Sequence, residues 1–148
     1  MEYLGNIYFH PVVDGEKYMA TKGHILIPVY GDIPCGPLNF LNDGLDGVLE
    51  IPNEMIGDGD YFVLRAKGDS MIGAGISSGD LVIVKKQNYA EEAQIIVAFV
   101  EGETTLKRFY KNDKQQLVEL RPENENYKTI YTSECVILGV AVKIIKDI

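Results

Sequence analysis

The sequence predicts a mainly β domain in which many short strands form a folded-over, partly barrel-like sheet with little helix. Short apolar runs rich in β-branched and aromatic residues recur along the 148-residue chain. Stretches rich in Gly, Asp, Asn and Pro separate these runs and are typical of turns. Hardly any stretch has the apolar period of 3.6 residues that an amphipathic helix requires.

The N-terminal third differs in character from the rest. Residues 13–16 (VDGE) predict a hairpin tip between the runs at 6–12 and 17–23. Residues 28–47 are so rich in proline and glycine that they predict an extended, flexible segment without a regular element, or simply a linker. We therefore divide the chain into an N-terminal arm (1–27), a flexible segment (28–47) and a folded domain (48–148).

Six strands are predicted in the folded domain, at 61–67, 80–86, 93–100, 104–110, 115–121 and 135–145. Residues 100–104 and 110–114 have the composition of hairpin connections. Residues 52–57 could form one helical turn with Pro52 at its first position, and residues 87–93 are the other weak helix candidate.

Composition limits the classes of partner. Hydrophobic residues make up 46% of the chain, charged residues 24%, and the formal net charge is −8. Such a chain is repelled by DNA phosphates and by anionic membranes, so we do not expect it to hold DNA itself. No apolar run approaches the roughly 20 residues that span a bilayer. Cys35 and Cys135 are spaced like neither a zinc site nor a disulfide framework, so we expect two free thiols and a cytosolic location. A single Cys35–Cys135 bridge is the alternative, which a reducing compartment disfavours. We expect no metal or cofactor.

One serine occupies an unusual place. Ser70 lies in KGDSMIGAG (67–75), a glycine-rich break between the strands predicted at 61–67 and 80–86. A serine there is commonly just a turn residue. However, backbone amides beside glycines can point outward together, as an oxyanion hole needs, and the adjacent Met71 and Ile72 indicate a site shielded from water.

A nucleophilic Ser70 needs a base, and both histidines lie far upstream in the chain. Lys107 is the alternative, because strand alternation places it on one face with Thr105 and Phe109. A lysine that faces solvent on an edge strand would be unremarkable. If Lys107 is buried, desolvation lowers its pKa, and the neutral amine can accept the serine proton, as in known serine–lysine pairs.

Three motifs in order resemble the LexA/UmuD family of self-cleaving serine peptidases (S24 peptidases), whose fold signal peptidases share more remotely. They are the run from Lys67 to Val84, the run TTLKRF (104–109), and LRPENENY (120–127), which resembles an L-x-P-x-N-x-x-Y turn. The resemblance covers about residues 26–146. It implies that Ser70 is the nucleophile and Lys107 the general base, 37 residues apart as in the family.

The resemblance also implies a substrate within the chain. The family cuts an Ala-Gly or Cys-Gly bond in an upstream loop, which corresponds here to Cys35-Gly36, with Cys35 as a small side chain rather than a nucleophile. We take the backbone amides of Asp69 and Ser70 as the expected oxyanion hole. A RecA filament on single-stranded DNA is the expected stimulus. A homodimer through the apolar strand at 135–145, which suits strand pairing, is the expected assembly.

Two departures from the family pattern leave alternatives open. Pro37 follows the expected cleavage site and bears on the rate. Only about 27 residues precede the flexible segment, too few for a repressor's winged helix-turn-helix domain. The chain would then be a UmuD-like short form or a repressor fragment whose residues 1–27 are a remnant of the DNA-binding domain. The alternative function is a dimerisation or docking module, for example for a translesion polymerase, in which cleavage only alters partner choice.

Overall fold

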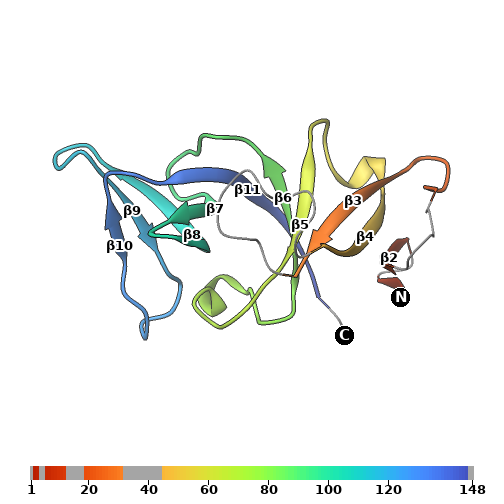
Figure 1. Cartoon of the computed structure of the whole chain (residues 1–148), viewed down its shortest axis with the longest axis horizontal. Helices are drawn as coiled ribbons and strands as arrows, with labels where there is room; N and C mark the ends of the chain where they lie inside the picture. Colours follow the sequence, from red (N-terminus) through yellow and green to blue (C-terminus); the bar gives the residue numbers. More distant parts are fainter. Residues whose placement is uncertain (1, 4–5, 13–18, 32–44, 147–148) are drawn as a thin grey trace.

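The computed structural model describes residues 2–3, 6–12, 19–31 and 45–146. These residues form one sheet in the strand order β1-β2-β4-β3-β5-β6-β11-β7-β8-β9-β10. Figure 1 shows β2–β4 at one end of an elongated molecule, β8–β10 at the other, and β5, β6 and β11 between them. The predicted mainly β class is confirmed, although the sheet stays open and does not close into a barrel.

The element bounds follow the chain from end to end. The strands and the two short 3₁₀ helices are β1 (Glu2–Tyr3), β2 (Ile7–Pro11), β3 (His24–Tyr30), β4 (Leu45–Pro52), η1 (Asn53–Met55), β5 (Tyr61–Arg65), η2 (Ile72–Ala74), β6 (Leu81–Lys86), β7 (Ile95–Val100), β8 (Glu103–Asn112), β9 (Leu117–Arg121), β10 (Ile130–Thr132) and β11 (Val136–Ile145). Adjacent strands are antiparallel except β3 and β5. No helix among the described residues is long and apolar enough to cross a membrane.

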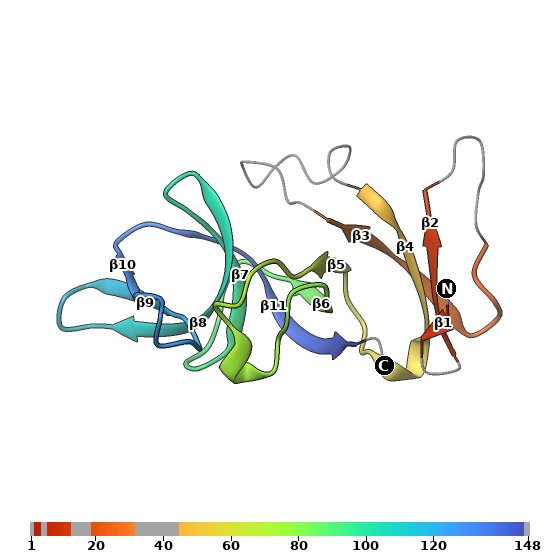
Figure 2. The same cartoon turned by 90° about the horizontal axis from the view of Figure 1, so that it is seen from below.

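The central strand β6 is buried on both faces, which explains its uninterrupted apolar run. Leu81 and Ile83 face one core, built with side chains of β2–β5, while Val82 and Val84 face a second core on the other side. Fully burying a side chain of this size contributes about 1.5–3 kcal/mol. A third core lies between β7, β8, β9 and β11. The sheet therefore folds over so that different stretches of both faces are covered, as Figure 2 shows from below.

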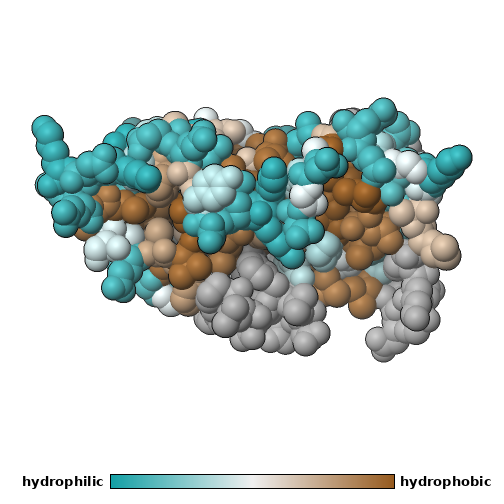
Figure 3. Space-filling view, turned by 90° about the horizontal axis from the view of Figure 1, so that it is seen from above, coloured by the Kyte–Doolittle hydropathy of each residue, from teal (hydrophilic) through white to brown (hydrophobic). Residues whose placement is uncertain are grey.

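Polar side chains cover the outside of this arrangement. On the face in Figure 3, apolar side chains lie in patches that hydrophilic side chains interrupt. The two hairpins predicted around the β7–β8 and β8–β9 connections are present. Glu101 and Gly102 both have positive φ, 52° and 79°, as the tightest hairpin turns require.

Four sequence expectations differ from the structure. Residues 28–30 and 45–47 were expected to lack regular structure but belong to β3 and β4, because their backbones pair across Tyr30 and Leu45. Residues 87–93 form bends and a turn instead of a helix. The partners of β2 are β1 and β4 rather than residues 19–23, and the expected tip at 13–16 lies outside the described residues. The three-residue β10 was too short to recognise in the sequence.

The apolar strand β11 is paired over only part of each edge. It pairs with β6 through Gly139–Ile145 and with β7 through Val136–Val140, so the expected pairing of this strand region with a second copy stays a prediction. What β11 offers to a partner is a partly exposed face, on which Val142 is 45% and Ile144 is 38% exposed. The division into arm, segment and domain stays a prediction, although β2, β3 and β4 contribute to the same core as β5 and β6.

We predict a homodimer that buries this face of β11. Wild-type chain should sediment as a dimer at concentrations on the order of tens of micromolar, where modest interfaces persist. The double variant Val142→Glu/Ile144→Glu should sediment as a monomer because it places charges in an apolar contact. Tyr131→Glu, an equally drastic change at a 58% exposed side chain of β10, is the control. A wild-type monomer, or a double variant that remains dimeric, would contradict this interface.

Candidate active site

The connection between β5 and β6 holds Ser70 in a closed loop. The Ala66 amide donates to the Asp80 carbonyl and the Gly79 amide to the Ala66 carbonyl, so residues 66–80 are tied at their base. Gly68 has φ +74°, a left-handed conformation that side chains disfavour, and it turns the chain toward Ser70. The short helix η2 follows Ser70 directly. The serine therefore sits at the start of a compact turn above the central sheet.

Two apolar side chains anchor this loop to the core. Met71 and Ile76 are each 2% exposed and pack in the core that Val82 and Val84 of β6 also line. Ser70 itself is half-buried. The residue after the serine is thus fixed by packing, while the hydroxyl stays at the surface of a cavity. Of the two neighbours expected to shield this turn from water, Met71 is buried, whereas Ile72 is 47% exposed.

Lys107 of β8 is buried, and it meets Ser70. The residue is 8% exposed. Its Nζ atom lies 2.6 Å from Thr105 Oγ1 and 3.2 Å from both Ser70 Oγ and the Leu106 carbonyl oxygen. None of the described carboxylates forms an ion pair with it. Burial lowers the pKa of Lys107 below its ordinary value of 10.5, because no nearby negative charge offsets the cost of desolvating the ammonium.

Thr105 is a site residue whose role the sequence did not reveal. Alternation along β8 places Thr105 and Lys107 on one face, so the signal was present, but alternation does not say that the hydroxyl touches the amine. In the structure the threonine hydroxyl makes the shortest contact of Nζ. It therefore holds the amine in the direction of Ser70.

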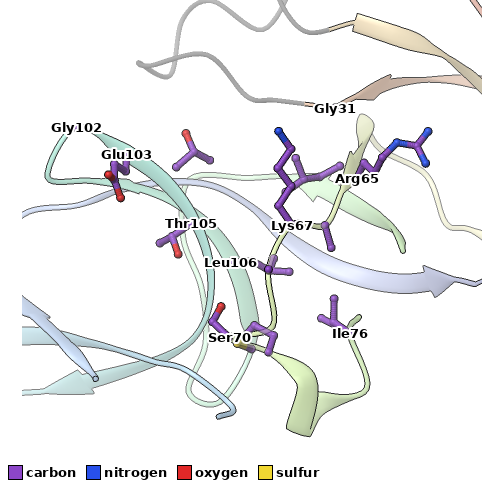
Figure 4. A pocket seen from close by; sticks show the side chains of 14 residues that line it. Gly31, Arg65, Lys67, Ser70, Ile76, Gly102, Glu103, Thr105 and Leu106 are labelled. Atoms are coloured by element: carbon purple, nitrogen blue, oxygen red, sulfur yellow. The ribbon is translucent and has the colours of Figure 1, made fainter. Parts of the chain in front are cut away.

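The folding of the sheet brings Ser70 and Lys107 together. Ser70 follows β5 and Lys107 lies in β8, and β6, β11 and β7 separate these two strands in the sheet. Figure 4 shows Ser70 facing Thr105 and Leu106 across a pocket between the turn and β8. The pocket is a cleft of about 570 Å³ with apolar walls that include Leu64, Met71 and Ile76. Such a cleft suits a short stretch of peptide.

One rim of the cleft is where β3 ends. Gly31 lines the pocket, and a side chain there would collide with Asp46, which forms an ion pair with Arg65. The expected cleavage site, Cys35-Gly36, lies outside the described residues. In the sequence Cys35 comes four positions after Gly31, a stretch whose fully extended span is about 14 Å.

Both histidines are engaged elsewhere. His10 Nε2 lies 3.2 Å and His24 Nδ1 2.8 Å from the two carboxylate oxygens of Glu50, which is 4% exposed. Burial alone would raise the pKa of Glu50, but the hydrogen bonds from Thr21, His10 and His24 outweigh it and hold the pKa below its ordinary range. This cluster belongs to β2, β3 and β4. In the described part of the chain, therefore, lysine is the basic group beside Ser70.

The segment after β9 contacts the Ser70 turn, another feature that sequence reasoning left without a role. The Glu123 amide donates to the Ser70 carbonyl at 2.8 Å, and the Gly73 amide donates to the Glu123 carbonyl at 2.7 Å. Asn124 and Tyr127 both donate hydrogen bonds to Asp69.

The backbone amides of Asp69 and Ser70, the expected oxyanion hole, are not used within the described structure. Among the described residues, none accepts a hydrogen bond from either amide. No group of three described His, Cys, Asp or Glu residues is placed to hold a metal ion.

Comparison with known proteins identifies the family. The family model for peptidase S24-like proteins matches residues 28–142, most of the chain. The chain belongs to the peptidase S24-like family. It is 36% identical to the LexA repressor of Caldicellulosiruptor saccharolyticus over 91% of its own length, and 38% identical to that of Syntrophomonas wolfei over 92%. It is 40% identical to the LexA repressor of Clostridium perfringens over 83%.

The match is not to whole relatives. It covers 65% of the C. saccharolyticus and S. wolfei repressors and 60% of the C. perfringens repressor. The matched residues of this S24 family member include the Ser70 turn, β8 with Lys107, and the segment at 121–127. The resemblance seen in the sequence is therefore confirmed at the level of the family.

Burying Lys107 should cost stability, which Lys107→Met tests. We expect the free energy of unfolding at pH 7 to rise by about 1 kcal/mol, because the variant keeps the packing and removes a desolvated charge. Wild-type stability should increase with pH between the lowered folded pKa and 10.5, since there the unfolded chain binds the proton and the folded chain does not. The difference should thus shrink near pH 10. Urea unfolding measures it, with exposed Lys111→Met of the same strand as control. If Lys107→Met is less stable than wild type at pH 7, burial of the Lys107 ammonium does not destabilise the fold as expected.

Proposed function

We propose that this chain is the self-cleaving serine endopeptidase domain of an SOS-response, LexA-like repressor or UmuD-like protein. The observation that carries the proposal is the contact between Ser70 Oγ and the Nζ atom of a buried lysine without a carboxylate partner among the described residues. In this role Ser70 is the nucleophile, Lys107 is the general base, and the Cys35-Gly36 bond of the same chain is the substrate. The family membership and the LexA relatives support the same activity.

The three contacts of Nζ suit a neutral amine. A neutral lysine has two N–H groups and one lone pair. If the two N–H groups are donated to Thr105 Oγ1 and the Leu106 carbonyl, the lone pair is left for the Ser70 hydroxyl. The lowered pKa makes this neutral form more accessible. Burial thus activates the base, and Thr105 and the Leu106 carbonyl direct it.

The reaction then proceeds in two balanced halves. Ser70 Oγ attacks the carbonyl carbon of Cys35 while its proton moves to Lys107 Nζ. The C–N bond to Gly36 breaks, and Lys107 returns the proton to the departing amine, leaving an ester between Cys35 and Ser70. A water molecule, deprotonated by Lys107, hydrolyses that ester and restores Ser70. The amides of Asp69 and Ser70 stabilise the oxyanion in both halves.

A tethered substrate explains how one cleft can favour one bond. Residues 31–44 connect Tyr30 to Leu45, two residues that pair across β3 and β4 beside the cleft. Because enzyme and substrate share a chain, docking is intramolecular and the effective concentration is high. Small residues at Cys35 and Gly36 let the chain turn within the cleft, while Pro37 restricts it and affects the rate.

A partner protein can change the cleavage rate by changing how often the cleavage segment is docked in the cleft. A RecA filament that binds the docked form better than the undocked form would raise the cleavage rate by shifting the population. The exposed face of β11 supports dimerisation, the core of the alternative in which cleavage mainly changes the set of partners, such as a translesion polymerase. With a net charge of −8, residues 1–148 are repelled by DNA phosphates, so in this proposal they do not themselves hold DNA.

Removal of the nucleophile is the first test of this function. Wild-type chain incubated at alkaline pH should yield residues 1–35 and 36–148, and N-terminal sequencing of the larger fragment should read Gly-Pro-Leu-Asn-Phe. Ser70→Ala should remain uncut and keep wild-type stability in urea, because a hydroxyl at the edge of the cleft contributes little to folding. Ser77→Ala, a second serine of the same loop, is the control. A different new N-terminus, or cleavage of Ser70→Ala at the wild-type rate, would overturn the assignment.

The pH profile tests the base. Because Lys107 acts when neutral, the rate should rise with pH and level off above the lowered pKa, with the midpoint below 10.5. Lys107→Arg keeps its charge throughout this range and should be inactive at every accessible pH. Activated RecA should raise the rate at neutral pH. A Lys107→Arg variant that cleaves normally would exclude the serine–lysine mechanism.

A further inference from the structure

We propose that Asn124 and Tyr127 are positioning residues that hold the Ser70 turn in its reactive geometry. Both side chains reach from the segment after β9 to Asp69, the residue before the proposed nucleophile. This inference rests on the proposed function and adds a role for side chains that touch neither the scissile bond nor Lys107. It also gives a physical purpose to the segment at 121–127.

Asn124 is one of two donors that fix the direction of one peptide group; the other is the Ile72 amide, 3.1 Å from the same Asp69 carbonyl oxygen. Asn124 Nδ2 donates to this main-chain carbonyl oxygen of Asp69 at 3.0 Å. That carbonyl shares a planar peptide with the Ser70 amide, and in a trans peptide the C=O and N–H point in opposite directions. Fixing the Asp69 oxygen therefore fixes where the Ser70 N–H points. This N–H is one of the two donors of the proposed oxyanion hole.

Tyr127 and Glu123 hold the turn on either side of that peptide. The Tyr127 hydroxyl donates to Asp69 Oδ1 at 2.5 Å, and this contact raises the pKa of the tyrosine. The Glu123 amide donates to the Ser70 carbonyl at 2.8 Å, which fixes the next peptide in the same way. The close approach leaves no room for a side chain at Gly73, because a Cβ there would lie 2.6 Å from the Glu123 oxygen.

The turn needs such support because of its composition. Glycines at 68, 73 and 75 give residues 67–75 more backbone freedom than other residues would. Met71 and Ile76 anchor the side after Ser70. The side before it, at Gly68 and Asp69, is held by Asn124 and Tyr127, from a segment more than 50 residues later in the chain.

The segment is in turn tied to the strand that carries the base. Arg108, next to Lys107 in β8, donates from Nε to Glu123 Oε1 and from Nη1 to the Ala93 carbonyl at 2.6 Å. Neighbouring residues of a strand point to opposite faces. Thus Lys107 contacts the serine from one face of β8, while Arg108 on the other face restrains the segment that orients it. The positions of the proposed base and nucleophile therefore both depend on β8.

The isosteric variant Asn124→Asp separates orientation of the turn from local structure. Asn124 Oδ1 accepts from the Asn126 amide at 2.9 Å, a bond within its own segment. Aspartate keeps that acceptor but loses the donor to Asp69 and places an oxygen against the Asp69 carbonyl. Asn124→Ala removes both bonds. Tyr127→Phe removes only the hydroxyl, and Tyr131→Phe on neighbouring β10 is the matched control.

The experiment measures first-order self-cleavage of the full chain between pH 7 and 10.5, together with urea unfolding in the same buffer. We expect Asn124→Asp to lower the plateau rate about tenfold or more, at least as strongly as Asn124→Ala, since small misalignments are costly in such sites. Tyr127→Phe should lower it several-fold, and Tyr131→Phe should match wild type. The pH midpoint should stay unchanged in Asn124→Ala and Tyr127→Phe, because these neutral variants add no charge near Lys107. Asn124→Asp adds a carboxylate, which favours the ammonium form of Lys107 and can raise the midpoint, so for this variant the plateau rate is the readout.

Several results would overturn the proposal. Asn124→Asp cleaving like wild type while Asn124→Ala is slow would mean that Asn124 serves only its own turn. A neutral variant with a shifted pH midpoint but an unchanged plateau rate would mean that the substitution acts on Lys107. If the Asn124 and Tyr127 variants are unfolded in assay buffer, the loss of cleavage would be due to misfolding. Failure of the proposed function is distinct, since wild type would then stay uncut, or Ser70→Ala would be cut.

Discussion

A lysine amine held out of water beside a serine hydroxyl is the constraint on which the rest of this structure depends. Lys107 can lie 3.2 Å from Ser70 only because the sheet folds over between β5 and β8. That folding requires strands that are apolar on both faces, and β6 and β7 have this character. Desolvation of the amine is costly, and the three separate cores provide the stabilisation that tolerates it.

The groups around Lys107 Nζ are suited to a neutral amine rather than to an ammonium ion. A carboxylate beside Lys107 would stabilise the ammonium and raise its pKa, which would oppose its use as a base. The site instead offers the neutral oxygens of Thr105, Ser70 and Leu106. In the proposed neutral form, Thr105 Oγ1 and the Leu106 carbonyl accept from the two N–H groups and the lone pair faces the Ser70 hydroxyl, so no charge is fixed. The one buried carboxylate with close histidine contacts, Glu50, is placed in the other half of the sheet.

The Ser70 loop shows how a glycine-rich turn can be both permissive and ordered. Its glycines allow a tight path and the close approach of Glu123 at Gly73. Order comes from outside the loop, from apolar packing of Met71 and Ile76 and from hydrogen bonds to residues 123–127. Because β8 carries Lys107 and also anchors Glu123 through Arg108, a shift of β8 would move both reacting groups together.

Sequence reasoning correctly predicted the β class, six of the strands and the family, and it named Ser70 and Lys107 as the candidate pair, because these depend on local apolar patterning and on motifs contiguous in the chain. It could not determine that Lys107 is buried, since alternation places a side chain on a face but not under a neighbouring loop. It missed β10, and it left Thr105, Asn124 and Tyr127 without roles. These points depend on contacts between distant parts of the chain, because β8, the Ser70 turn and residues 121–127 meet through the curvature of the sheet, a long-range property that no local pattern encodes.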